Sequence, residues 1–342
     1  MTTRYRAMQV AADQHLALVE RECSAPSPED VLIRVEACGV CGADLADIRN
    51  ADPTLPTPRV PGHELVGRIV AMGAAVPDLW SVGQRVGIGR LGGHCGRCAQ
   101  CRAGRFQRCE NQPITGATRD GGYAEYALAR HTGLVSIPDE LRSEQAAPVL
   151  CAGIATFNAL RACGAGPGDT VAIFGIGGLG HLAVQYAQRM GFRVVALGRG
   201  SEIAAAALRL GAHRYVDTDE EEAVAVLQSM GGAIAIVSTV TDAHSTSTLL
   251  PALAPGGRMI LLGVARAPLE VSVGQLVSGE RAVQGYLTGT PLQTEHVLRF
   301  GVLTDAHPVI ETLPLEDANE ALRRLRSGAV TFRTVLLMRP GV

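Results

Sequence analysis

The sequence predicts an α/β protein that combines a β-rich domain with a doubly wound parallel sheet. Up to about residue 150, short runs with strand composition are separated by Gly and Pro. From about residue 152, strand-like and helix-like runs alternate, which is the pattern of a parallel sheet with helices on both faces. After about residue 285 the pattern is mixed, and it ends on a strand-like run that could rejoin the first domain.

In the first part, β-rich runs are expected at residues 31–40, 63–73 and 84–89. The sequence DGGYAEYALA at 120–129 is typical of a turn that leads into an alternating strand. In the second part, a strand is expected at 170–175 and an amphipathic helix at 179–191, followed by strands at 193–198, 213–217, 233–240 and 258–264 and a helix at 202–212. The last part predicts a helix at 315–328 and a strand at 331–338.

A glycine motif, GIGGLG, connects the first strand of the second part to its helix. Its key positions, Gly175, Gly177, Gly178, Leu179 and Gly180, match G-x-G-x-x-G. Glycines allow a tight turn and a close approach to a pyrophosphate, and the helix N-terminus presents free N–H groups to the anion. Because strand and helix flank the motif, we expect a Rossmann dinucleotide site.

The end of the second strand of this unit predicts which coenzyme is bound. An acidic residue there would accept the ribose hydroxyls of NAD. The sequence instead has Gly198, Arg199 and Ser201, and Arg199 and Ser201 could hold a 2′-phosphate. We therefore expect NADP(H) to be preferred over NAD(H), with a solvated loop charge as the alternative role of Arg199.

The composition excludes several classes of function. The chain has 342 residues and a formal net charge of −2, which provides no basic field for nucleic acid or anionic lipid. All 31 basic residues are Arg, so Schiff-base lysines and a P-loop lysine are excluded. The N-terminal stretch has no apolar signal segment and no long apolar run occurs, so we expect a cytoplasmic protein without membrane contact.

Four cysteines within residues 92–110 predict a structural zinc site. Cys95, Cys98, Cys101 and Cys109 can surround one Zn²⁺ tetrahedrally and leave no open position. A rival interpretation is a zinc ribbon that binds nucleic acid, because the same lobe contains Arg97, Arg102, Arg105 and Arg108. The lobe has no aromatic platform beyond Phe106, which argues against that rival.

Cys41, His63 and Cys151 are candidates for a second, open zinc site. Two thiolates and one imidazole leave a fourth position for water or substrate. Their wide separation in sequence makes their spacing uninformative, and the reason to group them is a resemblance. The segments GVCGADL, PGHE, DGGYAEY and CAGIATF, the four-cysteine lobe and GIGGLG make the chain similar to the zinc-containing medium-chain alcohol dehydrogenases almost end to end.

This resemblance implies a GroES-like catalytic domain, residues 1–151 and 286–342, interrupted by a Rossmann coenzyme domain, residues 152–285, with the active site in the cleft between them. It implies that Cys41, His63 and Cys151 are the catalytic zinc ligands. It also implies that Glu64 can approach the metal, that Asp44 orients His63, and that Arg333 pairs with a coenzyme phosphate.

The sequence departs from the family pattern where the family often has a proton relay. Ala43 and Ala46 stand at the usual Ser or Thr and His positions, and neither side chain can carry a proton. Water or a rearranged group such as Asp47 would have to deliver the proton. Arg90 stands where relatives often place a Trp, and it either faces the substrate pocket and favours a polar or anionic substrate or points to solvent. Gly42 and Ala155 also replace residues that are common near the coenzyme.

We therefore predict a zinc-dependent oxidoreductase that transfers hydride between NADP(H) and a small alcohol or aldehyde, with two zinc ions per chain. The missing relay keeps open an alternative, the reduction of C=N or of an activated C=C. A protein that kept the fold and the zincs but lost catalysis is a further alternative. The resemblance also implies a homodimer or homotetramer and a small-molecule substrate.

Overall fold

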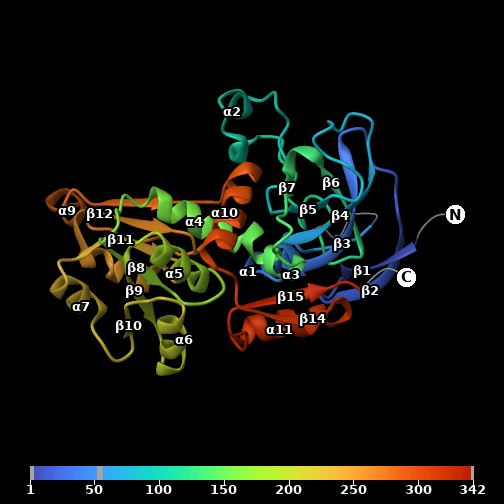
Figure 1. Ribbon diagram of the computed structural model, residues 1–342. Helices are drawn as coiled ribbons and strands as arrows, with labels where there is room; N and C mark the ends of the chain where they lie inside the picture. Colours follow the sequence, from blue (N-terminus) through green and yellow to red (C-terminus); the bar gives the residue numbers. More distant parts are fainter. Residues whose placement is uncertain (1–3, 52–56, 340–342) are drawn as a thin grey trace. The chain divides into compact units, whose positions relative to one another are not determined.

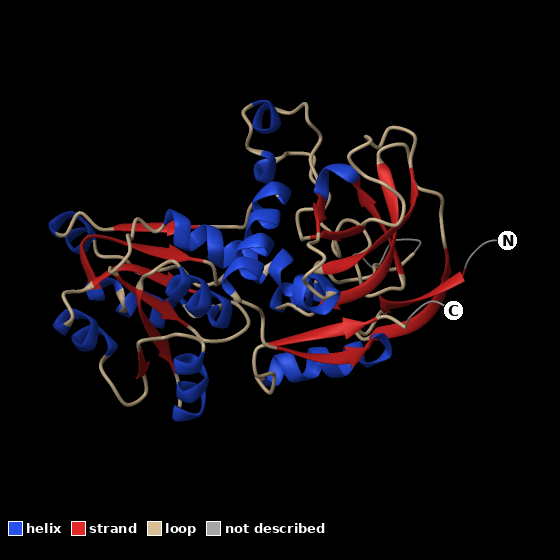
Figure 2. Ribbon diagram, in the orientation of Figure 1, coloured by secondary structure: helices blue, strands red, loops and turns tan. Residues whose placement is uncertain are grey.

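We describe the fold from a computed structural model that covers residues 4–51 and 57–339 (Figure 1, Figure 2). These residues form two compact units. The first contains the described parts of Met1–Cys151 and Pro308–Val342, with Gly289–Leu303, and the second contains Ala152–Thr288 and Thr304–His307. In the described part of the chain, no helix is both long and apolar enough to cross a membrane.

The first unit is built on a two-stranded hairpin and a seven-stranded sheet. The hairpin pairs β1 (Arg4–Val10) with β2 (Leu16–Glu22). The larger sheet has the order β14-β15-β3-β4-β5-β7, and β6 also pairs with β3. Its strands are β3 (Asp30–Gly39), β4 (Leu65–Met72), β5 (Arg85–Ile88), β6 (Tyr126–Arg130), β7 (Leu134–Ser136), β14 (Ile310–Pro314) and β15 (Arg333–Leu337).

Strand β3 lies at the centre of this sheet because every second side chain along it is apolar. Val31, Ile33 and Val35 are buried and pack in the core of the unit. Strand β15 pairs antiparallel with the end of β3, Val335 opposite Gly39, which confirms that the last predicted strand rejoins the first part of the chain. The loop that follows β3 therefore leaves a rigid, buried strand.

The helices of the first unit are short except for two near the end of the chain. They are α1 (Gly42–Arg49), α2 (Ala99–Arg102), α3 (Ser143–Ala146), α10 (Pro291–Thr304) and α11 (Ala318–Ser327), with 3₁₀ turns η1 (Phe106–Arg108), η2 (His131–Gly133), η3 (Ala147–Leu150) and η6 (Leu315–Asp317). Helix α11 lies within the predicted range 315–328 and ends at Gly328 with φ of 71°. Helix α10 was not predicted, although its buried Thr294, Val297, Leu298 and Gly301 have helical spacing.

The second unit is a six-stranded parallel sheet with the order β10-β9-β8-β11-β12-β13. The order reverses between β8 and β11, which is the topology of a Rossmann fold. The strands are β8 (Thr170–Phe174), β9 (Arg193–Gly198), β10 (Arg214–Asp217), β11 (Ala233–Ser238), β12 (Leu253–Leu261) and β13 (Ala282–Gly285). The helices are α4 (Ala152–Ala162), α5 (Gly180–Arg189), α6 (Ala204–Arg209), α7 (Ala223–Ser229), α8 (Ala243–Thr248) and α9 (Val273–Ser278), with 3₁₀ turns η4 (Ser201–Ile203) and η5 (Leu250–Ala252).

Two boundaries of the second unit differ from the expectation. Strand β12 begins at Leu253, before the predicted start at residue 258, because the register shifts opposite Ala233 and Ala235 and keeps the Pro-Gly-Gly stretch inside the strand. The unit also extends past residue 285 to Thr288. The Tyr286 N–H donates to the Leu261 carbonyl at 3.0 Å, which continues the ladder of the sheet edge.

Candidate metal centre and coenzyme site

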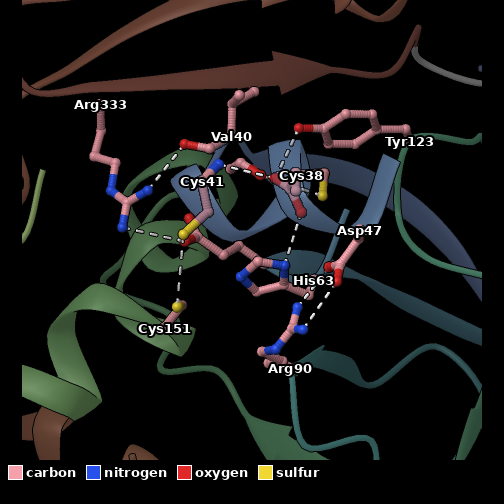
Figure 3. A network of polar contacts seen from close by, with 12 residues as sticks. Cys38, Val40, Cys41, Asp47, His63, Arg90, Tyr123, Cys151 and Arg333 are labelled. Atoms are coloured by element: carbon pink, nitrogen blue, oxygen red, sulfur yellow. Dashed lines mark hydrogen bonds and ion pairs between the residues drawn. The ribbon is translucent and has the colours of Figure 1, made fainter. Parts of the chain in front are cut away.

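Cys41, His63 and Cys151 converge although they are far apart in sequence. Cys41 follows β3 at the start of α1, His63 precedes β4, and Cys151 follows η3. The Cys41 and Cys151 Sγ atoms are 3.9 Å apart, and Figure 3 shows the His63 imidazole beside them. One ligand atom from each of these residues and from Glu64 lies within 4.8 Å of the others. The structure therefore brings together the residues that the resemblance grouped.

Asp44 connects two of these residues. Its Oδ1 lies 2.7 Å from His63 Nδ1, and its Oδ2 accepts a hydrogen bond from the Cys41 backbone N–H at 2.9 Å. Asp44 and His63 are fully buried. A buried carboxylate on one ring nitrogen sets the ring orientation and leaves Nε2 available to a metal, which is the arrangement expected for Asp44.

Tyr123 is a member of this network that the sequence analysis missed. Its hydroxyl donates to Asp44 Oδ2 at 2.9 Å, and its side chain is fully buried. The tyrosine lies in the DGGYAEY segment, just before β6. A buried tyrosine hydroxyl needs a polar partner, so a buried Tyr in this segment was a signal that could have been read. Figure 3 shows the Tyr123 hydroxyl pointing into the network.

The charges in this cluster shift the pKa values of its members. The nearby Cys151 thiol lowers the pKa of Cys41, and Arg333 and His63 add to that effect. Burial alone would lower the pKa of His63, but the negative charges of Asp44 and Cys41 outweigh it and raise that pKa. Burial raises the pKa of Glu64 to about 8, although Arg333 opposes the shift. The cluster thus contains a nucleophilic sulfur and a buried imidazole in direct contact.

Arg333 lies on the far side of Glu64 from bulk water. Its side chain is 3% exposed, its NH2 is 3.3 Å from Glu64 Oε1, and its NH1 donates to the Val40 carbonyl at 2.9 Å. These contacts place a guanidinium next to the Cys41 loop and neutralise a buried carboxylate. The predicted phosphate contact of Arg333 stays a prediction.

The donor set fits a zinc ion. The buried Nε2 atom of His63 has no hydrogen-bond partner of ordinary geometry among the described residues, and such an orphan atom is costly unless a ligand satisfies it. Two sulfurs and one imidazole nitrogen are the ligand types that Zn²⁺ prefers, and three ligands leave one position open. Glu64 is the only carboxylate in the cluster defined by these ligand atoms within the described residues.

Helix α1 presents no proton carrier at the two predicted relay positions. Ala43 and Ala46 are half-buried on this helix, and both oxygens of the neighbouring Asp47 accept hydrogen bonds from Arg90, at 2.5 Å and 2.9 Å. A carboxylate that is held in this way is poorly placed to deliver a proton. Asp44, Asp47 and His63 form a further cluster of possible ligands, but Asp44 and Arg90 already use their atoms, so we assign no ion to it.

The four cysteines of the lobe also converge, with Sγ atoms all within 4.8 Å of one another. The backbone N–H groups of Cys95 and Asn111 donate to Cys109 Sγ at 3.3 Å and 3.4 Å. Hydrogen bonds from the backbone N–H groups of Arg97 and Cys98 lower the pKa of Cys95 to about 6. Four sulfurs that receive N–H groups fit a closed zinc site. Phe106 packs on His94 with ring centroids 4.2 Å apart, so the lobe's phenyl ring is already stacked.

The glycine loop leads from β8 into α5 as predicted. Gly175 has φ of 91°, and a Cβ on Gly180 would lie 1.8 Å from the Gly175 carbonyl oxygen. A Cβ on Gly177 would meet no atom within 4 Å, so this face of the loop is open. The Thr239 hydroxyl donates to the carbonyl of Gly175 at 2.8 Å and fixes the start of the turn. An open glycine face at a helix N-terminus suits a pyrophosphate.

Arg199 and Ser201 lie in the exposed loop that follows β9. The loop is held from below by β10: Gly200 N–H donates to Asp217 Oδ1 at 3.0 Å, and the Tyr215 hydroxyl donates to the Gly200 carbonyl at 2.8 Å. Gly198 packs against Tyr215, whose hydroxyl would be 2.8 Å from a Cβ at that position. Asp217 is therefore a carboxylate near the loop that the sequence analysis did not consider, and the backbone of the loop already uses it.

Known proteins resemble this chain over nearly its whole length. Residues 27–139 match the family described as "Alcohol dehydrogenase GroES-like domain", and residues 178–302 match "Zinc-binding dehydrogenase". "Alcohol dehydrogenase notN" of Aspergillus sp. is 41% identical and covers 94% of each chain. The acetophenone reductase of Geotrichum candidum in complex with NAD has a TM-score of 0.86 and 27% identity, over 98% of each chain. The CAD of Helicobacter pylori complexed with NADP(H) has a TM-score of 0.87 and 26% identity, over 100% of each chain.

Proposed function

The chain belongs to the medium-chain alcohol dehydrogenase family, and on this basis we propose that it is a zinc-dependent oxidoreductase that transfers hydride between NADP(H) and a small alcohol or aldehyde. The observation that carries the proposal is the convergence of Cys41, His63 and Cys151 around an unpartnered imidazole nitrogen. These residues would hold the catalytic zinc, and the four-cysteine lobe would hold a structural zinc.

A zinc ion at this site would act as a Lewis acid on a carbonyl or alcohol oxygen. The residues of the chain would prepare the site for that chemistry. Asp44 holds the His63 ring in one orientation, and Arg333 balances the charge of Glu64 beside the ligands. Because Asp44, His63, Glu64 and Arg333 are all buried, bulk water does not weaken these interactions.

The preference for NADP(H) rests on the loop after β9. Arg199 is exposed, and no carboxylate pairs with its side chain among the residues that the structure describes. Its guanidinium would bind a 2′-phosphate, and the Ser201 hydroxyl would add a hydrogen bond. The glycine loop would hold the pyrophosphate through Gly177, Gly178 and the N-terminus of α5.

The reduction of C=N or of an activated C=C is the second candidate. It is favoured by Ala43 and Ala46 and by the engagement of Asp47 with Arg90, which together leave α1 without a side chain to supply a proton. Reduction of an iminium ion needs no coupled proton at the product nitrogen, whereas an alkoxide must be protonated. A family member with both zincs and no activity, or a nucleic-acid-binding lobe, receives no support from a specific contact.

We also propose that the protein is a homodimer or homotetramer that pairs through the edge of the coenzyme sheet. Strand β13 forms that edge and is largely exposed. Exposed apolar side chains lie on the segments next to it: Val264, Val273, Val277 and Leu287 are 85%, 74%, 72% and 66% exposed. An open strand edge with apolar neighbours is a surface that a second copy would cover. Cysteines used as metal ligands favour a reducing compartment such as the cytoplasm.

A substrate panel tests the proposed function. Purified protein is assayed with alcohols, aldehydes and cyclic imines, with NADP(H) and NAD(H), in both directions, and after dialysis against a zinc chelator. We expect turnover of alcohols and aldehydes that is lost with the chelator and returns with added zinc. Fast imine turnover with slow aldehyde turnover would favour the second candidate. Two zincs per chain without any turnover would indicate an inactive family member, and salt-dependent nucleic-acid binding would support the rival role of the lobe.

A further inference from the structure

An ion pair between Arg90 and Asp47 lies beside the proposed zinc ligands. Arg90 NH1 and NH2 donate to the two oxygens of Asp47 at 2.5 Å and 2.9 Å. An Asp47 oxygen lies within 4.8 Å of a ring nitrogen of His63. Figure 3 shows the guanidinium of Arg90 next to the His63 ring, with Asp47 alongside. The pair therefore joins the loop after β5 to α1 at the metal ligands.

The two members of the pair differ in exposure. The Asp47 side chain is 8% exposed and the Arg90 side chain is 32% exposed. The buried carboxylate anchors the guanidinium in one orientation through two parallel hydrogen bonds, which is the strongest geometry for such a pair. Asp47 uses two of the five N–H donors of the guanidinium, and it is the one partner of those donors among the described residues. The remaining donors are available to a bound molecule.

The position of Arg90 relates it to the open ligand position. Hydrogen bonding to Asp47 raises the pKa of Arg90, burial opposes that shift, and the negative charges of Cys151 and Asp44 raise it further. Arg90 is thus within electrostatic reach of Cys151 on one side and of Asp44 on the other. A molecule that enters the open position between Cys41, His63 and Cys151 comes close to its free N–H groups.

We propose that Arg90, held by Asp47, is a specificity-determining residue that donates a hydrogen bond to a second oxygen of the substrate. This inference rests on the proposed function. Because Asp47 neutralises the guanidinium, the pair offers directed donors more than net positive charge. The substrate class is accordingly a neutral alcohol or aldehyde with a hydroxyl or carbonyl oxygen next to the reacting carbon. A carboxylate in that position would be repelled by Asp47 and Asp44.

The test compares 1,2-ethanediol with 1-propanol, which have the same number of heavy atoms and differ in the second oxygen. The ratio of their kcat/KM values is measured for the wild type and for Arg90→Met. We expect the preference for the diol to fall about ten- to a hundredfold in the variant, as the loss of a hydrogen bond from a charged donor predicts, while 1-propanol changes by only a few fold. Arg68→Met is the matched control, because Arg68 pairs with Glu36 at 3.0 Å on β4 and should leave the ratio unchanged.

Arg90→Met leaves the Asp47 carboxylate without a partner, so a double variant, Asp47→Asn with Arg90→Met, is measured as well. Bound zinc and circular dichroism are recorded for every variant. A lowered ratio in both variants with zinc retained supports the inference. An unchanged ratio in both, or a normal ratio in the double variant, overturns it. If the wild type oxidises neither alcohol nor any other compound of the panel, the proposed function fails instead, so the two failures are distinguishable.

Discussion

Replacing Tyr123 with Phe removes one hydroxyl from the network that orients His63. Tyr123, Cys41 N–H and His63 Nδ1 all converge on the Asp44 carboxylate, with the first two on Oδ2 and the third near Oδ1. Phe occupies the same buried volume, so the variant deletes a hydrogen bond without creating a large cavity. We expect Asp44 to rotate more freely and His63 to be held less well for the metal.

The magnitude follows from the geometry of the carboxylate. Tyr123 supplies one of the two hydrogen bonds on Asp44 Oδ2, at 2.9 Å and fully buried. A hydrogen bond to a charged acceptor contributes about 1.5–3 kcal/mol. If that contribution is expressed in the metal-bound state, the zinc affinity of the site falls about ten- to a hundredfold, which agrees with the usual cost of losing a supporting partner of a metal ligand.

The assay is competition for zinc with a chromophoric chelator at one fixed pH, because protons compete with zinc for Cys and His. The four-cysteine site of the same chain is the internal reference. Tyr126→Phe is the matched control: Tyr126 lies three residues on in the same segment, is partly exposed, and packs edge-on against Tyr5 with ring centroids 5.8 Å apart. It should leave both sites unchanged. Equal zinc affinity of Tyr123→Phe and the wild type, within about twofold, would refute the role of Tyr123.

Three further outcomes are expected. Gly180→Ala should abolish coenzyme binding in a fluorescence titration while zinc content stays normal, because the new Cβ would lie 1.8 Å from the Gly175 oxygen; retained binding would contradict the open-loop geometry. Arg199→Ala should raise the KM for NADPH about ten- to a hundredfold and leave that for NADH nearly unchanged, and equal effects on both coenzymes would assign Arg199 to the solvent. Cys98→Ser should remove one of the two proposed zincs and lower the thermal unfolding midpoint of the first unit, whereas unchanged metal content by elemental analysis would exclude zinc from the lobe.

The local features of the two units were readable from the sequence. The alternating strand and helix patterns predicted β8, α5, β9 and their successors because buried parallel strands are continuous apolar runs. Helix α10 was missed because its apolar residues are mixed with polar ones, and the start of β12 was missed because Pro and Gly lie inside a bulged strand. Resemblance, and not spacing, grouped the three proposed zinc ligands.

The sequence by itself determined which donor groups the chain contains, where the glycine loop lies, and that no lysine or relay side chain is available. Only the tertiary structure decided that Tyr123 supports Asp44, that Asp47 holds Arg90, and that Arg333 meets Glu64. The physical reason is that hydrogen bonds and ion pairs act over about 3 Å, whereas these partners are separated by 79, 43 and 269 positions. Their encounters depend on strand order and register, which no local pattern encodes.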